Sequence, residues 1–298
     1  MQKQDIIITR TCPKSFEPGS VILDIHTSTR FWRTSRLLKA DLITTSEGNI
    51  KEVRLLSEKE SDEYDILLTV KRLLADSSRI FTFNGSAFDL PHLNKKYKAY
   101  ALESPLSGLP HTDLMLELRK YAPLLPLRSH ALSDYFSLLD TDATDCGSYS
   151  EAFKTLRVLQ ILNLEDFING SFTVHGLEID KEGDIARFHL SCSLPCPIKA
   201  ETEYFIVHGN GQEAEISVKI IDGNLRLYYA DYENYMYLPL EGYSVHKSVA
   251  KYIAASRKIP ADKGNCFTYI PLDDGFLDNA DKIKKYLISL LNAILSAK

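Results

Sequence analysis

Three aspartates are the residues of this sequence whose type and setting could support hydrolytic chemistry. Asp24 ends an apolar strand-like run in VILDIHT, Asp89 lies in TFNGSAFDLPHL, and Asp166 lies in NLEDFI. Carboxylate oxygens are the ligands that Mg²⁺ and Mn²⁺ prefer, and two such ions held about 3.5–4 Å apart promote phosphodiester cleavage. A fold that brings the three carboxylates together would therefore create a divalent-metal site suited to phosphoryl transfer.

His26 is a fourth candidate, because residues two apart on a strand point to the same face as each other. It follows Asp24 at that spacing and is expected to reach the same metal ion. A nitrogen ligand favours Mn²⁺, Zn²⁺ or Ni²⁺ over Mg²⁺. The alternative is an ordinary packed or surface histidine.

The elements expected to position these residues form an α/β arrangement. Strands are predicted at VILDI, LKADLITT, NIKEVRLLS and RIFTFN, and a helix is predicted over residues 57–76, with Ser57 as its cap and an apolar stripe at helical spacing. The chain is expected to turn at Asn84-Gly85 and to begin a second helix at Asp89. Further helices are predicted in HTDLMLELRKYA, around LRSHALSDYFSLL, and over SYSEAFKTLRVLQILNLEDFING. Strands followed by helices, with one strand–helix–strand crossover, predict a mixed sheet flanked by helices over residues 1–170.

A second, smaller α+β domain is expected over residues 171–298. Residues 171–240 read as about six antiparallel strands rich in tyrosine, with a hairpin turn at Asp222-Gly223. Two helices are expected to close the chain, one near SVHKSVAKYIAASRK and one over DKIKKYLISLLNAILSAK. The tyrosines either offer a stacking platform or pack across strands of a half-buried sheet.

The segments VILDIHTST, FNGSAFDLPHL and LNLEDF, in that order, resemble the three motifs of the ribonuclease-H-like exonucleases of the DEDD type. The similarity is greatest to the YprB-like ribonuclease-H-like domain family of Firmicutes and covers roughly residues 18–170. It implies that Asp24 bridges two metal ions, that Asp89 holds one directly or through water, and that Asp166 anchors the hydrolytic metal. Asp113, in HTDL, either matches a further family position or caps a helix.

Two family residues are replaced in this chain. The glutamate of the first motif is His26, and the histidine four residues before the last aspartate, expected to be the general base, is Leu162. Loss of a general base typically costs on the order of 10²–10⁴-fold in rate. Candidates to replace it are His92, His111 and Tyr149. The resemblance therefore implies a degenerate active site.

Nucleic-acid contacts are expected in two places. Asn84 and Gly85 would shape a turn whose backbone amides approach a phosphate or base. A basic run with interleaved aromatic side chains follows the first motif, and such a run suits a single strand through phosphate pairing and base stacking; it comprises Arg30, Phe31, Trp32, Arg33, Arg36 and Lys39. The alternative for this run is a solvated strand face.

The composition restricts the remaining classes. The 298 residues are 44% hydrophobic and carry a net charge of −5, so a nucleic acid would have to meet a local basic patch. The five cysteines are odd in number and scattered, which favours plain thiols over a zinc site. The sequence shows no secretory signal and no run approaching the roughly 20 apolar residues of a membrane helix. We expect a cytoplasmic protein with reduced cysteines and no membrane partner.

These observations predict a nucleic-acid-processing protein that, if active, is a 3′-to-5′ exonuclease using Mg²⁺ or Mn²⁺ on DNA or RNA, at single strands or ends. One alternative is a catalytically silent module that binds nucleic acid or acts as a scaffold. A third class is a protein-interaction module whose function lies in the second domain. Protein partners are not predicted.

Overall fold

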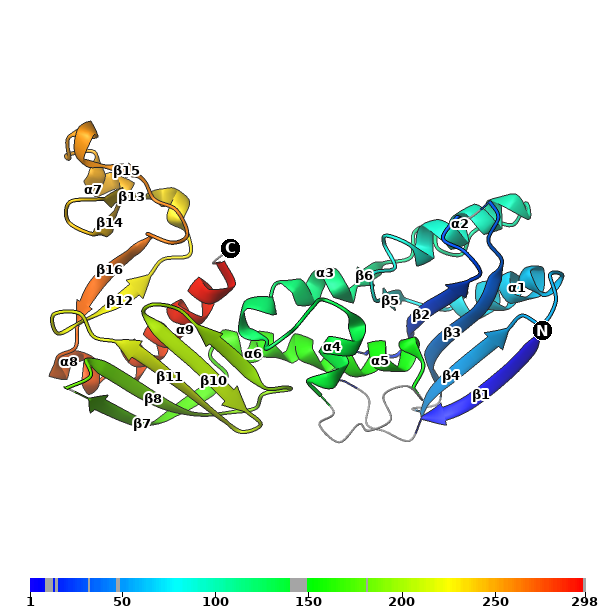
Figure 1. Cartoon of the computed structure of the whole chain (residues 1–298), viewed down its shortest axis with the longest axis horizontal. Helices are drawn as coiled ribbons and strands as arrows, with labels where there is room; N and C mark the ends of the chain where they lie inside the picture. The colour runs from blue at the N-terminus through cyan, green and yellow to red at the C-terminus, as the bar shows by residue number, and fades with distance from the viewer. Residues whose placement is uncertain are drawn as a thin grey trace. The chain divides into compact units, whose positions relative to one another are not determined.

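The computed structural model of the chain describes residues 1–8, 13, 16–31, 33–46, 49–139, 149–180 and 182–296. Trp32, Cys12 and Cys146, which entered the sequence analysis, lie outside these ranges. The chain divides into two compact units (Figure 1). The first comprises Met1–Arg119 and Leu127–Leu162, and the second comprises Lys120–Pro126 and Asn163–Lys298.

The first unit contains a six-stranded mixed sheet, here named sheet A, with the strand order β1-β4-β3-β2-β5-β6. Its strands are β1 (Gln2–Ile8), β2 (Ser20–Thr27), β3 (Leu37–Ser46), β4 (Asn49–Leu56), β5 (Arg79–Thr82) and β6 (His111–Asp113). The neighbouring strands β1, β4, β3 and β2 pair antiparallel to one another. Strands β2, β5 and β6 run parallel. The predicted strands are confirmed, and β1 is an additional edge strand that the sequence analysis did not predict.

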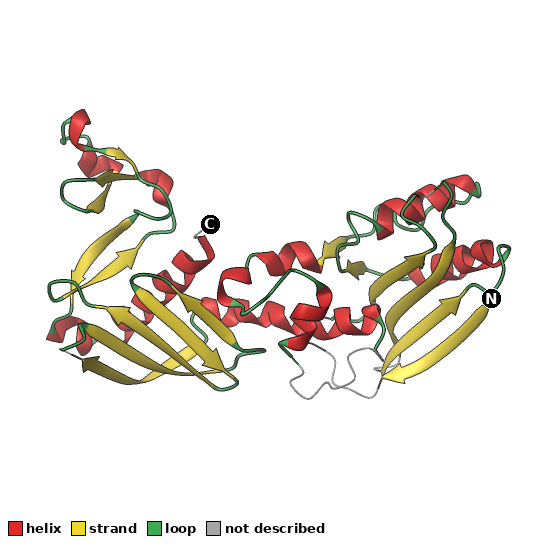
Figure 2. Ribbon diagram, in the orientation of Figure 1, coloured by secondary structure: helices red, strands yellow, loops and turns green. Residues whose placement is uncertain are grey.

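Helices cover both faces of sheet A (Figure 2). The helices that cover the sheet are α1 (Asp62–Leu74), α2 (Asp89–Ala99) and α5 (Glu151–Val158). The unit also contains α3 (Leu114–Arg119), which follows β6, and α4 (Leu132–Ser137), which packs on α5. The alternate β2 residues Val21, Leu23 and Ile25 join the apolar core formed with α1 and α2. Asp24 and His26 alternate with these residues along β2 and therefore belong to the opposite face of the sheet. Helix α5 packs against β2 and β3.

Two predicted helices have different bounds in the structure. The helix predicted from Ser57 begins at Asp62, because the Asp62 carboxylate accepts the backbone N–H groups of Glu58 and Lys59 and holds that segment in a turn. The continuous helix predicted over residues 148–170, of which residue 148 lies outside the described ranges, is divided into α5, a 3₁₀ segment at Leu159–Asn163 and α6 (Leu164–Ile168).

The second unit contains three small antiparallel sheets, so the prediction of one sheet of about six strands is wrong. Sheet B has five strands in the order β7-β8-β11-β10-β9. A second sheet pairs β12 with β16, and a third has three strands in the order β14-β13-β15. The strands are β7 (Phe172–Asp180), β8 (Ile185–Cys192), β9 (Ile198–Glu201), β10 (Phe205–Asn210), β11 (Glu213–Lys219), β12 (Asn224–Tyr228), β13 (Tyr235–Leu238), β14 (Tyr243–His246), β15 (Ile259–Pro260) and β16 (Phe267–Pro271). Asp222 and Gly223 form the predicted tight turn with positive φ angles of 49° and 73°. The chain then leaves sheet B, so β12 pairs with β16 instead of β11.

One long helix, α9 (Ala280–Ser296), supports the second unit together with the short helices α7 (Lys247–Ala250) and α8 (Asp274–Leu277). Tyr286 of α9 is buried and contacts the ring of Phe188 on the apolar face of sheet B. The helix predicted near residues 244–258 is a single turn, α7, because Tyr243–His246 joins a strand pair instead. In the part of the chain that the structure describes, no helix combines the length and apolar character needed to span a bilayer.

Candidate metal centre

The candidate site is built at the carboxyl ends of the parallel strands of sheet A. Asp24 and His26 lie near the end of β2, the Asn84 turn follows β5, and Asp113 ends β6. In sheets with parallel strands, ligands bind beside these strand ends. The topology thus gathers residues that are up to 89 positions apart.

Asp24, His26 and Asp41 converge on one face of β2 and β3. Each offers one ligand atom, and the three atoms lie within 4.8 Å of one another. The Nε2 atom of His26 is 3.1 Å from the Oδ2 atom of Asp24, and the hydrogen bond to this carboxylate raises the pKa of His26 above its ordinary value of 6.5. The predicted pair is therefore joined by a third residue that the motif comparison did not include.

Asp41 is completely buried, with 0% of the residue exposed. Burial raises the pKa of its carboxyl group above 3.8 despite an ion pair between Asp41 Oδ2 and Lys39 Nζ. The next residue across the sheet, Arg54, is engaged in a two-point contact with Glu52, at 2.9 and 3.2 Å. One sequence signal could have revealed Asp41: aspartate is disfavoured inside strands, yet it interrupts the apolar run LKADLIT.

Asp89 is the first residue of α2 and is 6% exposed. Burial, and next the charge of Asp24, raise its pKa to about 7, although its carboxylate accepts a hydrogen bond from the backbone N–H of Ile25. Asp24 is thus close enough to act on the charge of Asp89, and a metal ion shared by the two residues stays a prediction.

Asp113 holds the turn that follows β5. Its carboxylate accepts the backbone N–H groups of Asn84, at 2.8 Å, and Ser86, at 3.0 Å, as well as the Ser86 hydroxyl. It also accepts the N–H of Met115 at 3.1 Å, which confirms the predicted cap at the start of α3. Asp113 therefore fixes both the turn and the helix that follows.

The Asn84-Gly85 turn is confirmed, with Asn84 in the left-handed region at φ 62°. The Gly85 N–H donates to Thr82 Oγ1 at 3.2 Å, and a Cβ at Gly85 would lie only 2.4 Å from that oxygen. These contacts explain the glycine and occupy its amide. Nucleic-acid contact by Asn84 and Gly85 stays a prediction.

Leu162 and Asp166 lie on either side of the boundary between the two units in the sequence. Asp166 is exposed on α6, in the second unit, and Leu162 is half-buried at the end of the first. The convergence of Asp166 with Asp24 stays a prediction, because these residues belong to different units.

The proposed substitutes for the missing general base are held by other contacts. His92 is 3% exposed, its Nε2 lies 3.1 Å from Ser35 Oγ, and burial lowers its pKa. His111 Nε2 lies 2.8 Å from Thr82 Oγ1, and burial lowers its pKa as well. Tyr149 stacks on Phe153 with ring centroids 4.8 Å apart. The structure assigns the role of general base to none of them.

The described residues of the basic segment lie in the connection between β2 and β3. At its base, the Ser28 N–H donates to the Arg36 carbonyl and the Arg36 N–H donates to Ser28 Oγ. The amides of residues 34 and 35 donate to the Phe31 carbonyl. Phe31 is 79% exposed, and Arg30 and Arg33 are exposed beside it in the sequence. Arg36 is half-buried, with Nη1 4.0 Å from Glu60. The loop thus presents an aromatic ring with basic neighbours.

Comparison with protein families agrees with this topology. Residues 26–135 match the model of the RNase_H superfamily. The first unit is thus a ribonuclease-H-like domain, with a mixed sheet flanked by helices, and a unit of antiparallel sheets follows it. A comparison with curated proteins gave no significant match.

Among solved structures, the chain is similar to exonuclease I. The apo enzyme matches with a TM-score of 0.39 and 11% identity over 64% of this chain and 56% of that one. E. coli exonuclease I in complex with a dA16 oligonucleotide matches with a TM-score of 0.38 and 11% identity, over 64% of this chain and 54% of that one. An exonuclease I complex with SSB-Ct matches with a TM-score of 0.38 and 11% identity, over 94% of this chain and 74% of that one. The chain spans little more than half the length of the first of these enzymes. At these TM-scores the likeness carries no argument about mechanism or substrate.

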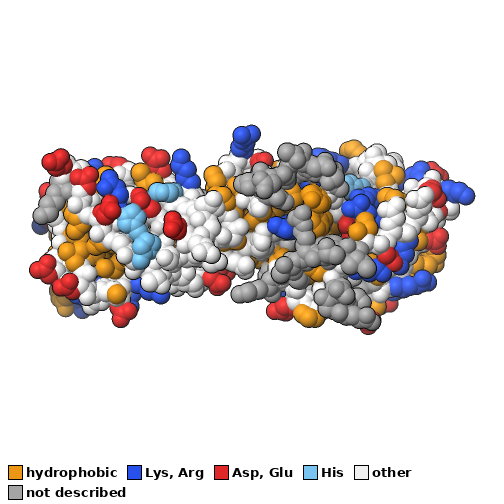
Figure 3. Space-filling model, turned by 90° about the horizontal axis from the view of Figure 1, so that it is seen from below, with side chains coloured by type: hydrophobic (Ala, Val, Ile, Leu, Met, Phe, Trp, Pro, Cys, Tyr) orange, Lys and Arg blue, Asp and Glu red, His pale blue; other side chains and the backbone are white. Residues whose placement is uncertain are grey.

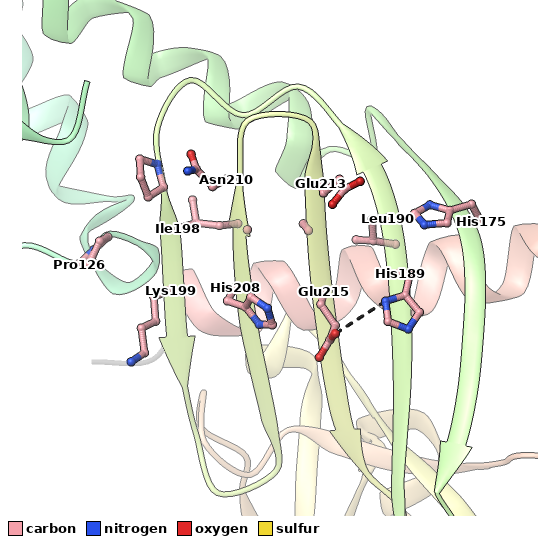
Figure 4. A pocket seen from close by; sticks show the side chains of 13 residues that line it. Pro126, His175, His189, Leu190, Ile198, Lys199, His208, Asn210, Glu213 and Glu215 are labelled. Atoms are coloured by element: carbon pink, nitrogen blue, oxygen red, sulfur yellow. Dashed lines mark ion pairs between the residues drawn. The ribbon is translucent and has the colours of Figure 1, made fainter. Parts of the chain in front are cut away.

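A separate groove of about 560 Å³ lies on sheet B of the second unit (Figure 4). Directly opposed residues form a row across its strands, and histidine and acidic side chains gather on this face in Figure 3. The row comprises His189, Glu215, His208 and Lys199. His189 Nδ1 lies 3.7 Å from Oε2 of Glu215, so these two members of the row are close enough to form an ion pair when the histidine is protonated.

The tyrosine-rich segment of the second unit makes ring contacts. Tyr229 stacks on Tyr235 with centroids 4.5 Å apart, and Tyr228 packs against Phe205 and Phe267. Tyr228 thus packs across the strand pair of β12 and β16, as one alternative predicts, and the stacking platform stays a prediction for the other tyrosines.

Proposed function

We propose that this chain is a ribonuclease-H-like nucleic-acid-processing protein that hydrolyses phosphodiester bonds from 3′ ends with Mn²⁺ or Mg²⁺. The observation that carries the proposal is the convergence of Asp24, His26 and Asp41, with Asp89 coupled to Asp24, at the carboxyl ends of parallel strands. Buried carboxylates such as Asp41 and Asp89 are costly unless a cation compensates their charge, and a divalent ion is the cation that phosphodiester chemistry uses.

The donor set fits a divalent cation. Asp24 and Asp41 offer oxygen and His26 offers nitrogen, and Asp41 Oδ1 is buried without a hydrogen-bond donor among the described residues. When bound, the ion supplies Lewis-acid activation of a phosphoryl oxygen and a more acidic water. The chain's own residues orient the substrate and hold the carboxylates in place.

The loop between β2 and β3 is the proposed contact for the nucleic acid. Phe31 can stack on a base, which is worth about 1–3 kcal/mol per base, and Arg30 and Arg33 can pair with phosphates. Because these residues follow His26 within eight positions, the loop begins at the site itself. Single strands and frayed ends suit this mode, since a duplex hides its base faces.

The test is a cleavage assay on 5′-labelled single-stranded DNA and RNA with Mn²⁺ or Mg²⁺. Wild type should give a ladder that shortens from the 3′ end, and Asp24→Ala should give none. Asp76→Asn, which changes an exposed carboxylate of the same unit, is the matched control and should cleave like wild type. Intact substrate after incubation with folded wild-type protein would refute the proposal.

A silent binding module is the second candidate, and one observation favours it. Protonated His26 and Lys39 pair with Asp24 and Asp41 and can neutralise them without a metal. On this alternative, the double change His26→Glu with Leu162→His should create or raise cleavage. Nucleic-acid binding without cleavage by the wild type would support this alternative.

The finer family placement, in the YprB-like branch of DEDD exonucleases, rests on the motif FNGSAFDLPHL and is part of the proposal. The reaction direction rests on the same resemblance. We include Asp166 as the third metal-binding aspartate that the resemblance implies, with Asp24 and Asp89. Asp166→Asn should reduce cleavage and leave the stability unchanged, because the residue is exposed.

A further inference from the structure

We propose that the cation of this site binds between Asp24, His26 and Asp41, with Asp41 as a ligand from the neighbouring strand, and that Lys39 is an intramolecular competitor for the same carboxylate. This inference deepens the proposed function and rests on it for the reaction. It concerns which residues of this chain select and hold the ion.

The register of β2 and β3 creates a compact square of four side chains. Asp24 lies directly opposite Asp41, and His26 lies directly opposite Lys39. Two are carboxylates, one is an imidazole and one is an ammonium group. Adjacent ligand atoms of an ion bound at about 2.1 Å are about 3 Å apart, and opposite ones about 4.2 Å. Separations of up to 4.8 Å therefore need only small side-chain movements to close on an ion.

Asp41 provides an observation that is independent of the clustering. Its side chain is completely buried, and no hydrogen-bond donor among the described residues reaches Oδ1. A buried carboxylate oxygen without a partner is costly, and Lys39 contacts the other oxygen. A cation placed between Asp41 and Asp24 would satisfy this oxygen and relieve the repulsion between two opposed carboxylates.

Lys39 has the properties of a displaceable internal cation. Its side chain is 24% exposed, and its four-carbon stem allows the ammonium group to move toward solvent. In the absence of a divalent ion it compensates Asp41 and keeps the buried charge tolerable. When the ion binds, the two positive charges repel each other, so Lys39 weakens the affinity that the ligands alone would give.

His26 determines which ions are held. Its side chain is 47% exposed, whereas Asp24 is 21% exposed and Asp41 is buried, so an ion enters from the His26 side. Two oxygens and one imidazole nitrogen favour Mn²⁺ or Zn²⁺ over Mg²⁺. The replacement of a glutamate by His26 thus changes the metal preference of the site rather than removing the site.

The experiment measures Mn²⁺ binding to the full chain by calorimetry, without nucleic acid. Asp41→Asn should weaken binding about 10- to 100-fold, and Lys39→Met should tighten it about fivefold. Lys51→Met is the matched control: this lysine of β4 forms a 2.9 Å ion pair with Asp5 at the sheet edge and should leave the affinity unchanged. Wild type should bind Mn²⁺ at least tenfold more tightly than Mg²⁺.

A second measurement does not depend on the folding of any variant. Pulsed EPR of Mn²⁺ bound to wild type labelled with ¹⁵N-histidine should show one directly bound nitrogen. Absence of that coupling, or an Asp41→Asn variant that binds Mn²⁺ like wild type, would overturn the inference. A chain that binds Mn²⁺ as described yet cleaves nothing would refute the proposed function and leave this ligand set standing.

Discussion

Asp24 on β2 and Asp41 on β3 face each other directly across an antiparallel strand pair. Like charges in this position destabilise a sheet, and the second of these carboxylates is wholly removed from water. The next opposed pair, His26 and Lys39, supplies the compensating cations. The fold therefore keeps a repulsive pair of carboxylates on the face of sheet A that packs against α5, and this pair is the basis of the cation site that we propose.

Asp89→Asn should separate stability from activity. The buried carboxylate beside Asp24 has a pKa raised to about 7, so a neutral amide of the same shape removes an unfavourable charge. The asparagine Oδ1 can still accept the Ile25 N–H. We expect a melting temperature at pH 8 no lower than that of wild type, and cleavage reduced at least about 10- to 100-fold. A variant that cleaves like wild type would remove Asp89 from the site.

Phe31→Ala should weaken nucleic-acid binding without affecting the fold. The ring is 79% exposed, so its removal should change the unfolding free energy by no more than about 0.5 kcal/mol. Loss of one base stack should raise the Kd for single strands about 5- to 150-fold in fluorescence anisotropy. Tyr252→Ala removes an equally exposed ring (82%) from the second unit and is the control. Equal affinities for Phe31→Ala and wild type would exclude the stacking role.

Asp113→Asn should disrupt the turn after β5. The carboxylate accepts the backbone amides of Asn84, Ser86 and Met115, and an asparagine would present its own NH₂ group to some of these donors. Loss of charge-assisted bonds at a residue only 6% exposed should cost about 2–4 kcal/mol in urea unfolding. If the unfolding midpoint does not move, the hydrogen-bond set described for Asp113 is wrong.

The buried pair between Glu63 and Lys96 should make the first unit sensitive to acid. Lys96 Nζ lies 2.9 Å from Glu63 Oε1, with both side chains less than 10% exposed. Burial acts to raise the pKa of Glu63, but hydrogen bonds from Lys96, the Leu37 amide and Tyr100 outweigh it, so the pKa lies below 4.5. A lowered carboxyl pKa contributes stability that is present above the unfolded value and is lost as the pH falls through the folded value.

Glu63→Gln tests this pair. At pH 7 it leaves a buried ammonium uncompensated and should cost about 3 kcal/mol in urea unfolding. Below about pH 4.5 the difference from wild type should shrink as wild-type Glu63 takes up its proton. Glu103→Gln, whose side chain is 90% exposed in a 3.4 Å pair with Lys71, should change the unfolding free energy little at either pH. A constant Glu63→Gln penalty across this pH range would contradict the assigned pKa direction.

The sequence by itself determined the local order of the first unit. Alternating apolar residues predict β2 and β3, an apolar stripe predicts α1, and Asn84-Gly85 predicts the turn before α2, because these signals depend on residues close in the chain. The same patterns place Asp89 at a helix start and Asp24 on β2, although this strand continues to Thr27, three residues beyond the end predicted at Asp24. They failed where local preference was overridden: the segment predicted as a long helix near residue 247 forms β14 and one helical turn.

Only the tertiary structure decided which side chains meet. Asp41 carries no motif, and its place opposite Asp24 follows from the register of a strand pair joined by a nine-residue connection, which periodicity alone does not fix. Likewise, Asp113 occupies the amides of a turn 27 to 29 residues away because β5 and β6 are parallel neighbours. Metal ligands and hydrogen-bond acceptors act over a few ångströms, so their roles depend on the pairing of strands that are distant in the chain.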